Sequence, residues 1–114
     1  MKRISKRDIK LTDHNVSNDK YNELKYFCKQ YREKKDELKN SRHTTEQKAK
    51  RSELLRSDIK MIEETAKEAE ESISPWLIKS VTEGVPYEWM DIPLSRTKFY
   101  DARRYFFYLL AQKR

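Results

Sequence analysis

The chain has 114 residues and a formal net charge of +7, with 39% charged and 36% hydrophobic residues. This length allows one domain, or one small domain with an extension. One glycine and three prolines leave few of the breaks that β-turns need, so we expect an all-α fold. No apolar run is long enough to span a membrane, and the charged N-terminus lacks the apolar stretch of a secretory signal. The single cysteine, Cys28, excludes an internal disulfide and fits a cytoplasmic protein.

The charges are distributed unevenly along the chain. Residues 1–17 carry five Lys or Arg against two Asp, and residues 93–114 carry six against one. Residues 58–71 are the opposite, with six acids against two lysines. Positive charge at both ends favours a polyanionic partner, because binding one releases its counterions. The alternative is a solvated basic tail with chance clustering.

Residues 1–17 lack apolar periodicity and are expected to form a flexible basic arm. Ser17 or Asn18 can cap a helix over about 19–40. Thr44 with Gln47 resembles a capping box that opens a second helix over about 45–71. The first apolar seam consists of Tyr21, Leu24, Cys28, Tyr31, Lys35 and Leu38, widened by Phe27. The second consists of Leu55, Ile59, Ile62, Ala66, Ala69 and Ile73.

These two helices predict an antiparallel hairpin, because a short polar loop joins them. Each helix shows one apolar stripe, so the pair alone buries little apolar surface. We expect the C-terminal helices, a second copy of the chain, or both to cover the rest. Residues 18–73 are therefore a candidate dimerisation region.

The segment 74–114 predicts a helix-turn-helix-like unit of three helices that binds DNA. Ser74 followed by Pro75 is typical of a helix start, with Ser74 as the N-cap and Ile73 and Ile78 as a hydrophobic staple. Gly84 marks the left-handed end of that helix. A short turn over 87–90 and an extended link then lead to Ser95, which caps a last helix that continues to Arg114.

The last helix has a core stripe and a basic side. The stripe consists of Phe99, Ala102, Phe106, Leu109 and Leu110. The aromatic run 105–108 wraps most of the helix, so the helix lies deep in the bundle or part of the run is an interface. The basic side is short enough at its start to enter a major groove. The alternative is a solvated surface, with its arginines paired to the acids of 58–71.

The candidate DNA-binding residues fall into three groups. We expect bases to be read by Arg96, Thr97, Lys98 and Tyr100. We expect phosphates to be held by Arg103, Arg104 and Lys113. The arm adds non-specific grip or enters a minor groove through Lys2, Arg3, Lys6, Arg7 and Lys10.

The stretch TEGVPYEWMDIPLSRTKFYDARR, residues 82–104, resembles the sigma-factor-type helix-turn-helix of small phage regulators of Gram-positive bacteria. The ArpU-like and RinA-like late-gene activators are the nearest groups. The first helix of the motif is matched by Tyr87, Glu88 and Met90, and the turn and reading helix by Leu94, Ser95 and Phe99. The interval from Tyr87 to Leu94 is shorter than usual, and Pro93 replaces the turn glycine.

This resemblance implies a sequence-specific regulator of phage transcription in the cytoplasm of a bacterial host. Its partners would be double-stranded DNA, a second copy of the chain and host RNA polymerase. Two other functions stay open: a DNA-packaging adaptor such as a small terminase subunit, and a phage-encoded inhibitor that binds a host nucleic-acid enzyme.

Other chemistry is not indicated by the sequence. His14 and His43 are far apart and form no zinc pattern with Cys28. A single glycine excludes a glycine-rich phosphate loop. The glutamates of 63–71 lack a histidine at metal-ligand spacing and are typical of a solvated acidic face. We therefore expect no metal, no cofactor, no small-molecule substrate, no membrane partner and no enzymatic activity.

Overall fold

The structure, a computed structural model, describes residues 16–40 and 46–114, and every regular element in these ranges is helical. The all-α prediction is confirmed. The elements are α1 (Asn18–Lys29), α2 (Tyr31–Asn40), α3 (Glu46–Glu70), η3 (Glu71–Ile73), α4 (Ser74–Glu83), η4 (Tyr87–Trp89) and α5 (Arg96–Lys113). Within the described ranges, no helix combines the length and apolarity that crossing a bilayer requires.

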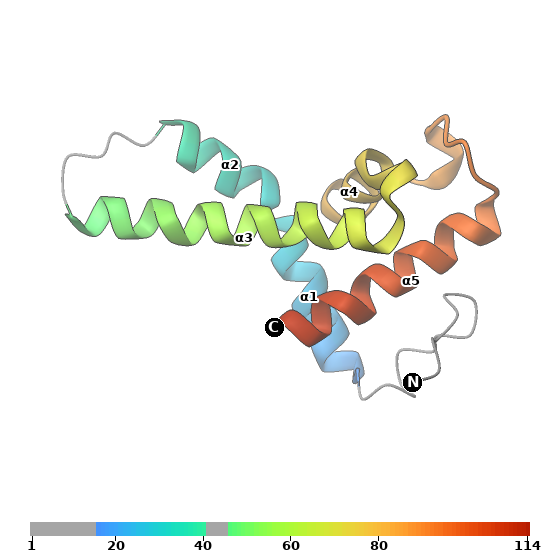
Figure 1. The fold of residues 1–114 in the computed structure, drawn as a ribbon, viewed down its shortest axis with the longest axis horizontal. Helices are drawn as coiled ribbons and strands as arrows, with labels where there is room; N and C mark the ends of the chain where they lie inside the picture. The colour runs from blue at the N-terminus through green and yellow to red at the C-terminus, as the bar shows by residue number, and fades with distance from the viewer. Residues whose placement is uncertain (1–15, 41–45) are drawn as a thin grey trace.

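The long helix α3 is the axis of the fold (Figure 1). Helix α2 lies antiparallel to its first half, and α4 and α5 pack against its second half. Helix α1 runs at a steep angle to α3 and packs against α4 and α5. The predicted seam of α3 is buried along its whole length, from Leu55, 2% exposed, to Ile73, fully buried. The core therefore forms where four helices meet around the second half of α3.

The predicted helix over 19–40 is broken at Gln30, which separates α1 from α2. The Gln30 N–H donates to the carbonyl of Phe27 at 3.3 Å and closes α1 there. The cause lies in the packing. Phe27 and Cys28 are buried in α1, which packs against α4 and α5, whereas the Tyr31 hydroxyl donates to Glu63 of α3 at 2.6 Å. One straight helix cannot reach both surfaces, so only α2 forms the hairpin with α3.

Most of the predicted helix ends are confirmed. The Ser17 and Ser95 side chains accept hydrogen bonds from the backbone N–H groups of Lys20 (3.1 Å) and Lys98 (3.3 Å). Gly84 ends α4 with φ 69°, and its N–H donates to the Ser80 carbonyl at 3.1 Å. These caps depend on local sequence, which is why their residue types reveal them.

The prediction of Ser74 as an N-cap is wrong. Ser74 is helical (φ −54°, ψ −40°), and its N–H donates to the carbonyl of Glu71. The N-cap position of α4 falls on Ile73, whose side chain makes no capping bond. The reason is that the extended residue lies earlier, at Glu70 (φ −164°, ψ 98°), and the 3₁₀ turn η3 then leads directly into α4, so Ser74 is already helical. Pro75 still lies in the first turn, as predicted. The Thr44 capping box falls outside the described residues.

The core stripe of α5 is confirmed, with Leu109 half-buried. The aromatic run divides between core and surface. Phe106 and Phe107 are buried, whereas Tyr105 and Tyr108 are half-buried with their rings stacked at 6.1 Å. The end of the predicted arm also belongs to the fold, because Val16 is only 4% exposed. Apolar burial thus holds the chain from residue 16 onward.

Candidate nucleic-acid interface

The start of α5 is held in place by Tyr87. The Tyr87 hydroxyl donates to the Leu94 carbonyl at 2.5 Å, which ties η4 to the residue before the Ser95 cap. The Tyr87 ring also packs against Phe99, with ring centroids 5.6 Å apart. Phe99 is fully buried, so the first turn of α5 stands on a rigid base. A side chain on this turn therefore points to solvent from a fixed backbone.

The unit 74–114 differs from a compact helix-turn-helix. The first helix of the predicted motif is only the 3₁₀ turn η4. It lies inside the connection between α4 and α5, Gly84 to Ser95, which is longer than a usual turn of about three or four residues. Pro86 holds an extended backbone (φ −65°, ψ 150°) before η4, and Pro93 follows it. Prolines lack an N–H and restrict the preceding residue, so neither end of η4 extends into a longer helix.

The first turn of α5 carries the predicted base-reading residues. Arg96, Thr97 and Lys98 are all exposed, and the Arg96 side chain keeps 67% of its surface open. The Arg96 guanidinium pairs with Glu88 of η4 at 3.0 Å and lies 5.4 Å from the centre of the Tyr100 ring. Lys98 has no acidic partner among the residues that the structure describes. Tyr100 is half-buried against Phe99.

Arg103, a predicted phosphate contact, points into the fold instead. Its guanidinium donates to the Ser80 hydroxyl of α4 at 3.2 Å and to the Tyr21 hydroxyl of α1 at 3.3 Å. It also lies over the ring of Phe107, 5.1 Å from its centre. These three contacts make Arg103 a link between α1, α4 and α5, and they turn its guanidinium toward the fold and away from a phosphate in solvent.

The other two predicted phosphate contacts differ from each other. Lys113 donates to the Thr65 hydroxyl at 2.9 Å and to Glu68 at 3.0 Å. This pairing joins a lysine of α5 to the acidic segment 58–71, whereas the alternative left open by the charge pattern placed the arginines there. Arg104 stays on the surface, where it pairs with Asp101 and keeps 45% of its side chain exposed. Arg104 is thus the more accessible of these two cations.

The basic residues of the predicted arm, Lys2, Arg3, Lys6, Arg7 and Lys10, lie outside the described residues. The point at which this segment joins the fold is clear, however. Val16 is buried and Ser17 caps α1. Tyr21, one turn further on, contacts Arg103 and packs on Phe107 at a centroid distance of 5.0 Å. The basic segment therefore joins the fold beside the middle of α5.

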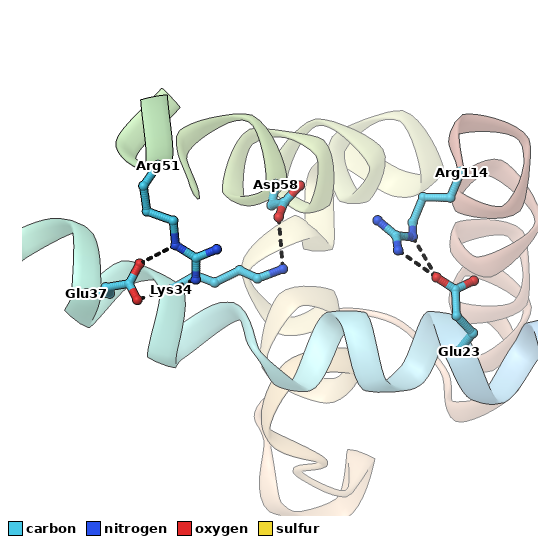
Figure 2. Close-up of polar contacts among 6 residues, drawn as sticks. All are labelled: Glu23, Lys34, Glu37, Arg51, Asp58 and Arg114. Carbon is cyan, nitrogen blue, oxygen red and sulfur yellow. Dashed lines mark hydrogen bonds and ion pairs between the residues drawn. The ribbon is translucent and has the colours of Figure 1, made fainter. Parts of the chain in front are cut away.

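A group of ion pairs that the sequence did not reveal joins α1, α2, α3 and the C-terminus (Figure 2). It consists of Glu23 with Arg114, Lys34 with Asp58, and Glu37 with Arg51, at distances of 2.6, 3.0 and 3.0 Å. Two of these cations also contact the Phe27 ring, with the Arg114 guanidinium 3.9 Å and the Lys34 ammonium 4.3 Å from the ring centre. The Arg114 hydrogen bond lowers the pKa of Glu23.

The C-terminal cations thus differ in what they offer a ligand. Arg103, Lys113 and Arg114 serve the fold. Arg96 pairs with the exposed Glu88, Arg104 pairs with the mostly covered Asp101, and Lys98 has no partner among the described residues. The accessible cations therefore lie in the first half of α5, at the end where the turn is exposed.

Metal or thiol chemistry would need clustered ligands or a reactive cysteine in the described ranges. No group of three or more metal-binding side chains occurs there. Cys28 is fully buried, and burial raises the pKa of its thiol to about 12. That thiol is therefore neutral and inert near pH 7.

Comparisons of the chain with protein-family models, with curated proteins and with solved structures find no match. The function proposed below therefore rests on the residues of the site and their geometry.

Proposed function

We propose that the protein binds double-stranded DNA sequence-specifically, as a phage-type transcriptional regulator, and that the first turn of α5 reads the bases. One observation supports this proposal above all: Arg96, Thr97 and Lys98 are exposed on a turn whose next residue, Phe99, is fully buried. Recognition helices contact base edges through their N-terminal residues, which need a rigid backbone and free side chains.

The side chains on this turn match the chemistry of base edges. Arginine and lysine donate to the two acceptors of guanine in the major groove, and a threonine methyl or an aromatic ring contacts the methyl group of thymine. Arg96 and Lys98 take the first role, and Thr97 and Tyr100 the second. Arg104 lies two turns further along, where a docked helix passes the phosphate backbone.

The ion pair of Arg96 with Glu88 must open for Arg96 to reach a base. Both side chains are more than half exposed, and an exposed pair is worth about 0–1 kcal/mol. A bidentate contact to guanine discriminates by about 1–3 kcal/mol, so the exchange favours the correct base. Glu88 then increases specificity, because a non-specific contact of Arg96 offsets less of the free energy lost when the ion pair with Glu88 breaks.

We expect the basic residues before Val16 to reinforce this contact. Their segment joins the fold near Arg103, and the helix rises only about 10 Å from Arg103 to Arg96. A stretch of fifteen residues can extend up to about 50 Å, so it can reach a groove beside the reading helix. In this proposal Lys2, Arg3, Lys6, Arg7 and Lys10 neutralise phosphates or enter the minor groove.

The proposal includes two protein partners and a cellular compartment. A second copy of the chain would present a second α5 to a second half-site. Host RNA polymerase would be the target of an activator, and the bacterial cytoplasm is where both meet DNA. A DNA-packaging adaptor is the second candidate, because Trp89, 81% exposed, offers a contact for ring assembly.

Fluorescence anisotropy with labelled duplex DNA over a salt series tests the proposal. We expect log K to fall linearly with log salt, and the double variant Arg96→Ala with Lys98→Ala to bind at least tenfold more weakly. Lys60→Ala with Lys67→Ala removes the same charge from the exposed surface of α3 and should bind like the wild type. Absence of binding, or equal loss in both double variants, would reject α5 as the reading element.

A further inference from the structure

A groove of about 430 Å³ lies between α2 and α4. Pro75 and Ile78 of α4 provide apolar surface on one wall, and Tyr31 of α2 on the other. This volume falls within the range of about 300–1,000 Å³ that is typical of ligand and side-chain pockets. The groove can therefore take one large apolar side chain.

The charges around the groove favour an acidic partner segment. Arg32 pairs with Glu83 across it at 3.2 Å, which neutralises both. Lys35 and Lys79 also line the groove, and neither has an acidic partner among the described residues. Asp36 is the remaining acid of the lining, so the unpaired charges leave a positive excess.

The η4 turn of the same chain has the complementary features. Trp89 is 81% exposed, more than the other exposed large hydrophobic residues, Tyr26 and Leu54. Glu88 precedes Trp89, and Asp91, two residues beyond it, has no basic partner in the described part of the chain. The Tyr87 hydrogen bond to Leu94 holds this turn in place. Tryptophan is among the residue types most enriched at the hot spots of protein interfaces.

We propose that the η4 turn of one copy docks into the α2–α4 groove of a second copy. Trp89 enters the groove against Pro75 and Ile78, and Asp91 faces the ammonium groups of Lys35 and Lys79. Trp89 does not fill the groove of its own chain, since it is exposed there. Two different patches meet in this contact, so it builds a reciprocal dimer or a head-to-tail ring. The inference concerns assembly and is independent of DNA binding.

Sedimentation velocity over a concentration series tests this contact. The wild type should self-associate, and Trp89→Ala should raise the dissociation constant at least tenfold. Tyr26→Ala is the matched control, because it removes another exposed aromatic ring, which lines neither the groove nor the turn, and should associate like the wild type. Far-ultraviolet circular dichroism and melting curves confirm that each variant is folded. A wild type that stays monomeric, or a Trp89→Ala variant that associates normally, overturns the inference.

Two further arms keep the test specific. Asp91→Lys and Lys79→Glu should each weaken association, and the chain that carries both should recover it, because the charges are exchanged across the contact. In addition, Trp89→Ala alters the η4 turn but keeps an intact groove. The double variant Lys35→Glu with Lys79→Glu alters the groove but keeps an intact turn. A mixture of these two should form a complex of two chains that neither forms alone. Failure of the charge exchange to restore association, or absence of that complex, counts against the contact.

Discussion

The guanidinium of Arg103 donates to the hydroxyl of Tyr21, 82 residues earlier in the chain, at 3.3 Å. The same guanidinium donates to Ser80 at 3.2 Å, so one side chain joins three helices. Its neighbour Arg104 is exposed and pairs, among the described residues, with Asp101, one helical turn away. Two adjacent arginines that look equivalent in the sequence thus have different roles. One stabilises the fold, and the other is accessible to a ligand.

We expect Arg103→Ala to lower the free energy of unfolding by about 1–3 kcal/mol, because the loss of Arg103 leaves Ser80 and Tyr21 without their donor. Urea unfolding followed by circular dichroism measures this change. Arg104→Ala is the control and should lower stability less than Arg103→Ala does, since the Arg104 side chain is 45% exposed and its pair with Asp101 lies within one helix. Equal losses in the two variants would contradict the assignment of Arg103 as a tie between helices.

Tyr87→Phe should destabilise the protein by about 0.5–1.5 kcal/mol, because it removes the hydrogen bond to the Leu94 carbonyl and keeps the packing on Phe99. We also expect faster hydrogen exchange at the first turn of α5. Tyr26→Phe removes a hydroxyl from an exposed ring and should leave both measurements unchanged. Unchanged exchange in Tyr87→Phe would mean that the buried Phe99 alone holds the turn.

Gly84→Ala should cost about 1–2 kcal/mol, because φ is 69° and a Cβ raises the energy of the left-handed region. No atom lies within 4 Å of the position that the new Cβ would take, so the loss comes from the backbone alone. Gly84→Asn should therefore cost less than Gly84→Ala, because asparagine tolerates this conformation better than alanine does. Thermal melts of the three proteins measure the order. An asparagine variant that melts below the alanine variant would indicate a steric cause instead.

The ion pair of Glu23 with Arg114 should make stability depend on acid pH. The hydrogen bond from Arg114 lowers the pKa of Glu23 in the folded protein, so the stabilisation is complete above the unfolded pKa, near about 4.3. It is lost as the pH falls through the lower, folded value. We expect wild type and Glu23→Gln to differ in unfolding free energy at pH 7 and to converge once the pH lies below the folded pKa of Glu23. A difference that stays constant between these pH values would exclude the ionised pair as its source.

Local patterns in the sequence predicted much of the fold. The seam of α3 and the stripe of α5 follow from helical spacing, and nearly all of their residues are buried. Ser17, Ser95 and Gly84 act as caps because a cap requires only its nearest neighbours. The exposure of Arg96, Thr97 and Lys98 could also be predicted, since they lie off the apolar stripe.

Contacts between distant segments could not be predicted in this way. The break at Gln30 needs neither glycine nor proline, and it arises because α1 and α2 pack on different neighbours. Arg103, Lys113 and Arg114 are paired with residues 82, 48 and 91 positions away. A spacing pattern shows which side chains share a helix face, but it carries no information on which other helix covers that face. The sequence alone thus determined the helices and their apolar sides, whereas the tertiary packing decided which cations remain open to a partner.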